Sequence, residues 1–468
     1  MGWDQDTLRA QFCHALSEMY KSEVPLYGDL VDLVWQADAE AINVSQRQGA
    51  TAIDPDQVLP SRNRVERHGA IRLGTASELA TIRRMFAIMG MFPVGYYDLS
   101  AAGFPMHATA FRPWTKEALS KHPFRVFTTV LRMELLTERT RELAQKALQQ
   151  RHIFTNRLVA LIELAETQGQ LSPTECGEFI VEGLETFRWH AKATVTMEEY
   201  QMLKAEHPLI ADVVSFPSCH INHLTPRTID IDLVQKMMQD HGMPAKERIE
   251  GPPRRQCPIL LRQTSFKALE ETVYFRDTHG AYLKGSHTAR FGEVEQRGYA
   301  LTRKGRQLYD TILSRVNIES IDRSISASEY ENLLVKHFKE FPDDMADLQS
   351  QQLAYFCYHL TSRGQEFPKL DLQGGKMTLN QLIENQVIRY EPVTYEDFLP
   401  LSAGGIFNSN LGNPLQSKQL VMEAEADLDG FQRMLGTSIM DEFHLYTQIQ
   451  QSSLEECRKK LGLEAIVE

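Results

Sequence analysis

The sequence predicts an α+β protein built from two copies of a βαβββ module, with helical segments before, between and after them. A histidine followed four residues later by an arginine occurs twice, at His68 and Arg72 and at His223 and Arg227. Each pair precedes an amphipathic helix that ends at a Gly-Met pair followed closely by proline. Strand-like runs follow each helix. Two such modules packed together would bring His68 and His223 to one point.

The first module is predicted over residues 66–133. A short apolar strand at 68–73 leads to Thr75-Ala-Ser-Glu78, a capping box typical of a helix start. The helix that follows has a single apolar stripe. Runs rich in aromatic and β-branched residues then predict three strands, at 94–99, 106–111 and 124–132.

The second module is predicted over residues 218–300 and has the same order of elements. A strand at 220–224 precedes a helix at 230–241. Three strand-like runs follow, at 246–250, 259–275 and 288–300. The pattern therefore indicates a diverged duplication.

Helical segments are predicted for the rest of the chain, at 1–65, 134–217 and 301–468. Capping boxes begin at Ser172, Thr196 and Ser326 and mark helix starts inside these segments. One stretch of the C-terminal segment differs. Residues 395–410 form a glycine- and serine-rich loop flanked by apolar residues, a composition that favours closure over a ligand.

The composition argues against several classes of partner. The 50 Lys and Arg against 62 Asp and Glu give a formal charge of -12, which disfavours nucleic acid or an anionic membrane as partner. The six cysteines are scattered without a C-x-x-C pair, as expected for a reducing cytoplasm. No apolar run is long enough to cross a bilayer, and no phosphate-cradling loop or nucleophile elbow is present.

Two histidines and one carboxylate are the ligand set of a divalent metal. Imidazole nitrogen and carboxylate oxygen suit iron, manganese, zinc or nickel, and a facial set of three leaves positions open for a chelating substrate and dioxygen. The carboxylate is Glu293 or Glu295, which would face the same side of a strand. The ordinary alternative is a pair of core histidines and a solvated acidic face. Reserve ligands are His107, His220 and His287.

The arginines that follow the two histidines suit a carboxylate-binding role. A guanidinium pairs with a carboxylate in bidentate fashion, so Arg72 and Arg227 are candidate clamps for an acidic substrate. Ordinary surface arginines are the alternative.

Four segments resemble the signature blocks of the 2-oxoadipate dioxygenase/decarboxylase family. They are Arg67-His-Gly-Ala-Ile-Arg-Leu-Gly-Thr75, Ile221-Asn-His-Leu-Thr-Pro-Arg227, Phe291-Gly-Glu-Val-Glu-Gln-Arg-Gly298 and Tyr395-Glu-Asp-Phe-Leu-Pro-Leu-Ser-Ala-Gly-Gly-Ile-Phe407. The family is related to the vicinal oxygen chelate superfamily, which is built from paired βαβββ modules. The resemblance spans nearly the whole chain.

The resemblance implies iron(II) held by His68, His223 and Glu293. Glu293 is preferred over Glu295 because Glu-Val-Glu-Gln-Arg resembles the Glu-x-x-Gln-Arg stretch that carries the metal-binding glutamate in hydroxyphenylpyruvate dioxygenases. By the same resemblance, Arg72 is the catalytic residue that holds a substrate carboxylate. The loop at Leu401 and Ser402 is expected to close over the 2-oxo acid, although Leu401 stands where the family pattern has valine.

The implied reaction converts 2-oxoadipate and dioxygen to 2-hydroxyglutarate and carbon dioxide, a step of lysine breakdown. Two other functions remain open from the sequence. One is a zinc- or nickel-dependent isomerase or lyase on the same scaffold, and the other is a non-catalytic binder of small molecules. Neither predicts an iron-binding triad together with an arginine clamp.

Overall fold

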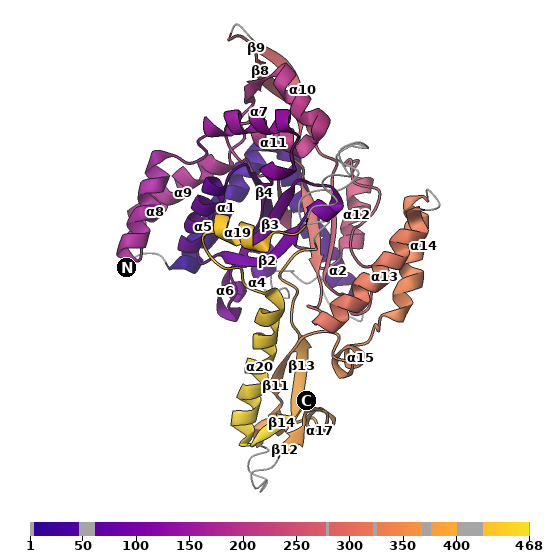
Figure 1. Ribbon diagram of the computed structural model, residues 1–468. Helices are drawn as coiled ribbons and strands as arrows, with labels where there is room; N and C mark the ends of the chain where they lie inside the picture. Colours follow the sequence, from indigo (N-terminus) through magenta and orange to yellow (C-terminus); the bar gives the residue numbers. More distant parts are fainter. Residues whose placement is uncertain are drawn as a thin grey trace. The chain divides into compact units, whose positions relative to one another are not determined.

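The computed structural model describes residues 4–45, 61–277, 280–321, 325–366, 376–399 and 425–467. The chain divides into two compact units that both mix helices and strands (Figure 1). The first unit comprises Met1–Glu250, Gln263–Gln296 and Asp397–Met440, and the second comprises Gly251–Arg262, Arg297–Glu396 and Asp441–Glu468. The protein is therefore of the α+β class.

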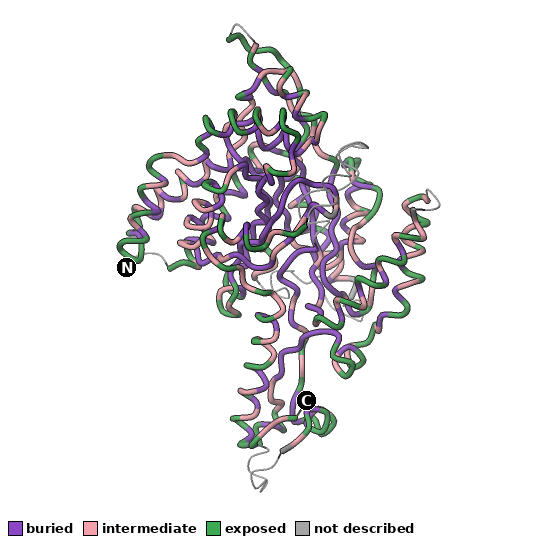
Figure 2. Tube along the Cα trace, in the orientation of Figure 1, coloured by how far each residue is buried: buried purple, intermediate pink, exposed green. Residues whose placement is uncertain are grey.

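The first unit is organised around central strands that are themselves buried (Figure 2). The strands in this part of the chain are β1 (Arg67–Leu73), β2 (Phe92–Asp98), β3 (Met106–Arg112), β4 (Arg125–Leu131), β5 (Lys192–Thr196), β6 (His223–Pro226), β7 (Leu261–Ser265), β8 (Glu270–Arg276), β9 (Tyr282–Thr288) and β10 (Glu293–Arg297). The helices are α1 (Gln5–Glu23), α2 (Pro25–Ser45), α4 (Ser61–Val65), α5 (Ala76–Ile88), α6 (Lys116–Lys121), α7 (Glu138–Gln149), α8 (Asn156–Gln168), α9 (Pro173–Phe187), α10 (Met197–Glu206), α11 (Pro208–Ser215), α12 (Ile231–Asp240) and α19 (Leu428–Leu435), with short 3-10 turns at Ser100–Ala102 and Met133–Leu135.

The strands and the helix predicted for residues 66–133 occur in the predicted order, as β1, α5, β2, β3 and β4, with strand ends at most two residues from the predicted ones. The short helix α6 between β3 and β4 was not predicted. Thr75 caps α5 by accepting a hydrogen bond from the backbone N–H of Glu78. The carboxylate of Glu78 accepts from the N–H of Gly74 instead of Thr75, so the predicted box is shifted by one residue.

A five-stranded sheet runs in the order β2, β3, β4, β1, β6. Strand β1 is parallel to β4 and antiparallel to β6, so β6 extends the edge of the sheet formed by the first four strands. Because side chains alternate along a strand, the sheet has two chemically different faces.

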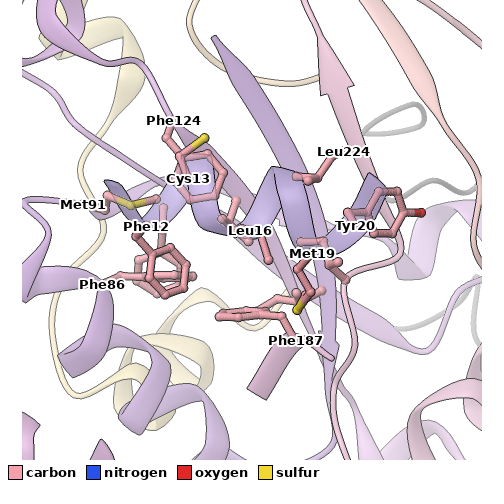
Figure 3. Packing of buried hydrophobic residues seen from close by; sticks show 14 of the residues in the cluster. Phe12, Cys13, Leu16, Met19, Tyr20, Phe86, Met91, Phe124, Phe187 and Leu224 are labelled. Carbon is pink, nitrogen blue, oxygen red and sulfur yellow. The ribbon is translucent and has the colours of Figure 1, made fainter. Parts of the chain in front are cut away.

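One face of this sheet is apolar and packs beneath helices. Ile71 on β1 and Val126 on β4 belong to the hydrophobic core. Leu224 on β6 and Phe12 and Leu16 of α1 belong to the same core (Figure 3). The opposite face carries His68 and Arg72 on β1. It is also buried, because every residue of β1, β3 and β4 is buried.

Helix α1 also contacts the backbone just before β6 and β10. The hydroxyl of Tyr20 lies 2.9 Å from the carbonyl oxygen of Asn222 and 2.8 Å from that of Phe291. These residues come just before His223 on β6 and Glu293 on β10. The helix therefore holds the starts of β6 and β10 in register with each other.

The second predicted repeat is only partly as expected. Strand β6 and helix α12 occur, and Asp230 caps α12 at the predicted start. The predicted strand at 246–250 is wrong in its extent, because this stretch makes only isolated bridges, Ala245 with Phe266 and Glu250 with Gln263.

The two long runs expected in the second repeat are each divided. Residues 259–275 form β7 and β8, and the run predicted at 288–300 forms β10, with β9 ending at Thr288. Strand β7 pairs with β10, whereas β8 and β9 form a hairpin that pairs with β5. The hairpin is half exposed, while β7 and β10 are buried. A continuous apolar run does not reveal such a break.

The segment between the repeats is helical as predicted, apart from β5. Capping boxes at Ser172 and Thr196 start α9 and α10.

The second unit mixes helices with two small sheets. Its helices are α13 (Arg303–Ile321), α14 (Ala327–His337), α15 (Met345–Ser350), α16 (Ser362–Glu366), α17 (Leu379–Glu384) and α20 (Glu442–Leu461), with a 3-10 turn at Phe338–Glu340. Strand β11 (Phe356–Leu360) pairs with β13 (Ile388–Pro392), and β12 (Lys376–Thr378) pairs with β14 (Ala465–Val467). The capping box at Ser326 starts α14 as predicted, but the strands were not expected in a helical segment. Among the described residues, no helix has the length and apolarity of a membrane span.

Candidate active site

The two repeated histidines meet on the non-core face of the five-stranded sheet. In the register between β1 and β6, His68 lies opposite Thr225 and Ala70 lies opposite His223. Paired residues point to the same face, so His68 and His223 project to the same side. Their ring centroids are 5.4 Å apart with perpendicular planes.

Glu293, the first residue of β10, completes a compact group with these histidines. Its Oε1 lies 3.0 Å from His68 Nε2 and 3.9 Å from His223 Nε2. One potential ligand atom from each residue lies within 4.8 Å of the other two, and all three side chains are buried. The structure thus brings together the three residues predicted as metal ligands.

The ring of His223 has the properties expected of a ligand. Neither of its nitrogens has a hydrogen-bond partner in the described part of the chain, and the same is true of Glu293 Oε2. Burial and then the charges of His68 and Arg72 hold the pKa of His223 well below its usual value, so the ring is neutral and keeps a lone pair. Buried polar atoms without partners are costly, and a divalent cation would satisfy one nitrogen of His223 together with the Glu293 carboxylate. The donor set therefore fits such a metal.

Glu295 contacts the other edge of the His68 ring. Its Oε2 is 2.8 Å from His68 Nδ1, while Glu293 faces Nε2. A ring that donates Nδ1–H to a carboxylate presents its Nε2 lone pair to a metal, and this fixes both tautomer and orientation. Burial alone would lower the pKa of His68, but Glu295 and Glu293 outweigh it and raise that pKa.

The Glu293 carboxylate is itself held in place. Oε1 accepts hydrogen bonds from Thr225 Oγ1 at 3.0 Å and from Gln263 Nε2 at 2.6 Å. These donors come from β6 and β7, the strands on either side of the group. They set the rotation of the carboxylate before any ion binds.

Arg72 lies on the same face of β1 as His68. Four residues of extended strand separate their Cα atoms by about 13 Å. Arg72 is buried, and its Nη1 donates to Asp212 Oδ2 at 2.7 Å. The sequence identified the arginine but gave no signal for Asp212, which is the one charged residue of the apolar helix α11.

The side chains of the other candidates contact partners other than His68, His223 and Glu293. Arg227 pairs with Glu66 at 3.1 Å. His107 Nδ1 lies 3.4 Å from the Tyr96 hydroxyl. His220 and His287 both contact Asp212.

The start of the glycine- and serine-rich loop reaches the metal-binding group. Phe398 meets the ring of His68 edge-on, with centroids 5.0 Å apart, and also packs on Phe127 of β4. The neighbouring Asp397 is buried and accepts two hydrogen bonds from Arg112, at 2.6 and 3.0 Å. Leu401 and Ser402 lie outside the described residues. Sequence reasoning found this loop but missed Phe398.

Comparison with known proteins places this site in a family. A family model described as 2-oxoadipate dioxygenase/decarboxylase matches residues 12–410. A Pseudomonas putida protein of that name is 50% identical over 461 residues, which cover 98% of this chain and 97% of that protein. The chain belongs to the 2-oxoadipate dioxygenase/decarboxylase family.

Further relatives of the family agree over the whole length. An Escherichia coli 2-oxoadipate dioxygenase/decarboxylase is 49% identical, covering 97% of this chain and 98% of its own. The crystal structure of the Pseudomonas putida hydroxyglutarate synthase in complex with 2-oxoadipate matches with a TM-score of 0.85 at 48% identity, covering 99% of both chains.

This family member has a second group of potential ligands in its described residues, in the second unit. Cys357, His359 and Glu391 lie on the paired strands β11 and β13. His359 and Glu391 are partly exposed and form an ion pair at 2.9 Å, which accounts for their proximity. This group lacks the burial and the unpartnered ring of the His68 group.

Proposed function

We propose that this chain is an iron(II)-dependent 2-oxoadipate dioxygenase/decarboxylase that converts 2-oxoadipate and dioxygen to 2-hydroxyglutarate and carbon dioxide. The observation that carries the proposal is the placement of His68, His223 and Arg72 on one face of the five-stranded sheet, with Glu293 of β10 beside the two buried histidines. Membership of the family supports the reaction, and the donor set supports the metal.

In this proposal His68, His223 and Glu293 hold the ion. A bound ferrous ion supplies open coordination positions where a 2-oxo acid chelates and dioxygen is activated. Glu295 orients His68, and Thr225 and Gln263 orient Glu293. The protein thus fixes the ligand geometry before substrate arrives.

Arg72 binds the carboxylate at the far end of the substrate. Arg72 lies about 13 Å along β1 from His68. The 2-oxo acid end of the substrate is at the metal in this proposal, and the guanidinium binds the carboxylate at the other end. Between His68 and Arg72 on the same face of β1 lies the small side chain of Ala70, which is buried. Leu401 and Ser402 remain proposed substrate contacts.

The surroundings of the site exclude water. Phe398 covers one edge of His68, and Phe291 stacks on His223 with centroids 4.7 Å apart. An apolar wall of this kind protects a reactive oxidant from solvent and confines the chemistry to the bound substrate.

We further infer that β1 to β4 and the segment from β6 to β10 are diverged copies of one βαβββ module, as in the vicinal oxygen chelate superfamily. The shared His-x-x-x-Arg pattern and the pairing of β1 with β6 support this. The predicted cytoplasmic location is supported by six buried free thiols.

The test is oxygen uptake by anaerobically iron(II)-loaded protein given 2-oxoadipate and labelled dioxygen. We expect one oxygen consumed per 2-hydroxyglutarate, with both labelled atoms retained in it. The variant Glu166→Gln, which alters only an exposed ion pair with Arg84, serves as the control and should behave as wild type. No uptake with iron would overturn the proposal; turnover with zinc or nickel would then indicate an isomerase or lyase, and tight binding alone a non-catalytic binder.

A further inference from the structure

Asp212 is a buried carboxylate in an otherwise apolar helix. The remaining positions of α11 are occupied by residues such as Leu209, Val213 and Val214, and the side chain of Asp212 is 4% exposed. A buried charge is strongly unfavourable unless it is paired and hydrogen-bonded. Its partners therefore indicate why it is there.

Three cationic or hydrogen-bonding side chains converge on this carboxylate. Arg72 Nη1 is 2.7 Å from Oδ2, while His287 Nε2 and His220 Nε2 are 2.8 and 3.1 Å from Oδ1. The far nitrogen of His287 lies 2.9 Å from the Tyr200 hydroxyl. Asp212 is thus held on one oxygen by two histidines and presents the other oxygen to Arg72.

This arrangement keeps the carboxylate charged. Burial would raise the pKa of Asp212, but the charges of His220 and Arg72 and the hydrogen bonds from His220 and His287 hold it well below its usual value. Arg72 consequently has a permanent internal counter-ion. A long arginine side chain otherwise loses considerable rotamer entropy when a ligand immobilises it.

We propose that Asp212 is the positioning residue for Arg72 and that it makes the site select 2-oxo acids with a second, distal carboxylate. A guanidinium has five N–H donors in a rigid planar fork, so a contact at Nη1 sets the plane in which the rest of the fork meets a ligand. Preorganisation of this kind improves binding of the ligand that uses the fork and leaves other ligands unaffected. The inference rests on the proposed function, because it takes Arg72 as the substrate clamp.

Apart from His220, which lies three residues before His223, the support for Asp212 comes from parts of the chain that hold none of the proposed metal ligands. Asp212 and Tyr200 belong to α11 and α10 in the segment between the repeats, and His287 belongs to β9 of the inserted hairpin. Trp189 packs against both histidines, stacking on His287 and meeting His220 edge-on. Helices α10 and α11 and the β8–β9 hairpin therefore together support the carboxylate that contacts Arg72.

The experiment compares two ligands that differ only at the far end. Anaerobic iron(II)-loaded protein is titrated calorimetrically with 2-oxoadipate and with 2-oxohexanoate, which has a methyl group in place of the distal carboxylate. The readout is the Kd for 2-oxohexanoate divided by the Kd for 2-oxoadipate. In Asp212→Asn we expect this ratio to fall about tenfold, within the coupling range of contacting residues, while the Kd for 2-oxohexanoate stays within about twofold of wild type.

Arg72→Met separates this inference from the function on which it rests. If Arg72→Met leaves the ratio unchanged, the proposed clamp is wrong. If Arg72→Met removes the preference for 2-oxoadipate and Asp212→Asn does not, only the role of Asp212 is overturned. Glu166→Gln is the surface control and should keep the wild-type ratio.

A second variant covers the case in which Asp212→Asn does not fold, as judged by its Tm and metal content. His287→Gln keeps Asp212 but removes the ring that bridges Oδ1 to Tyr200. We expect a smaller fall in the Kd ratio than in Asp212→Asn. If Asp212→Asn is unfolded, a wild-type ratio in folded His287→Gln overturns the proposal.

Discussion

The imidazole of His68 lies between two carboxylates, with Glu293 at 3.0 Å from Nε2 and Glu295 at 2.8 Å from Nδ1. The two acids are adjacent positions on the same face of β10, yet they contact opposite edges of one ring. Glu295 therefore lies at the Nδ1 edge of the ring. Glu293 lies at the Nε2 edge, on the side of His223. In the proposed site Glu293 binds the metal, and Glu295 orients the ring of His68.

Glu295→Gln should weaken metal binding without abolishing it. The amide can still accept the Nδ1–H hydrogen bond, but the charge that polarises the ring is lost, so iron(II) affinity should fall about 10- to 100-fold. Competition with a chelator of known affinity measures this. Glu293→Gln is the comparison and should lose the metal far more severely. If Glu295→Gln lost more iron(II) affinity than Glu293→Gln, Glu295 would be the ligand.

His223→Leu should remove the metal yet leave the metal-free protein at least as stable as wild type. The buried ring of His223 has no hydrogen-bond partner among the described residues, so its replacement relieves a desolvation cost of about 1 kcal/mol or more. Urea unfolding of the metal-free proteins gives the free energies. His287→Leu is the contrast, because that ring is bonded to Asp212 and Tyr200, and it should lose about 2 kcal/mol. A marked destabilisation of His223→Leu would show a structural role instead.

Asp397→Asn should be among the most destabilising single changes in the first unit. It breaks a buried two-point ion pair with Arg112 and leaves that guanidinium with a neutral partner, at a cost of about 3 kcal/mol in the free energy of unfolding. Phe398 should then lose its fixed place against His68. Glu166→Gln, in an exposed pair, should change stability by less than about 0.5 kcal/mol. Equal effects of the two changes would contradict the role given to Asp397.

His107 should make the protein sensitive to mild acid. Burial, followed by the charge of Arg132, lowers the pKa of His107 from 6.5 to about 4. Between these two values the unfolded chain binds a proton that the folded chain does not, so stability decreases as the pH falls, by up to about 1.4 kcal/mol per pH unit.

Unfolding of His107→Gln at several pH values between 4 and 6.5 checks this sign. The variant should show a shallower loss of stability with falling pH than wild type. Some slope should remain, because burial lowers the pKa of His122 in the same way. Identical slopes in the two proteins would mean that His107 does not contribute.

The first repeat was predictable because its signals are local. A cap at Thr75, the apolar stripe of α5 and alternating strands all lie within the segment that they define. The second repeat was not, because the β8–β9 hairpin pairs with β5, which is distant in sequence. A local sequence pattern does not show where a continuous apolar run is divided into two strands that pair with different partners.

The site was also predictable only in part. The repeated pattern identified His68, His223 and Arg72, since one position is used twice. Choosing between Glu293 and Glu295 required the distances to the two nitrogens of His68, because both residues face the same way. Asp212 gave no signal, since a single acid in an apolar helix has no periodicity.

The proposed metal ligands come from β1, β6 and β10, whereas Asp212, which contacts Arg72, lies on α11 and is supported by Tyr200 of α10 through His287 of β9. Arg72 itself shares β1 with His68, so only the support of the clamp comes from other stretches of the chain. Grafting residues 192–215 and 270–288 from a relative that prefers a different acid should therefore shift the substrate preference while the reaction itself is retained. Substrate preference can in this way change during evolution while the proposed metal ligands are kept.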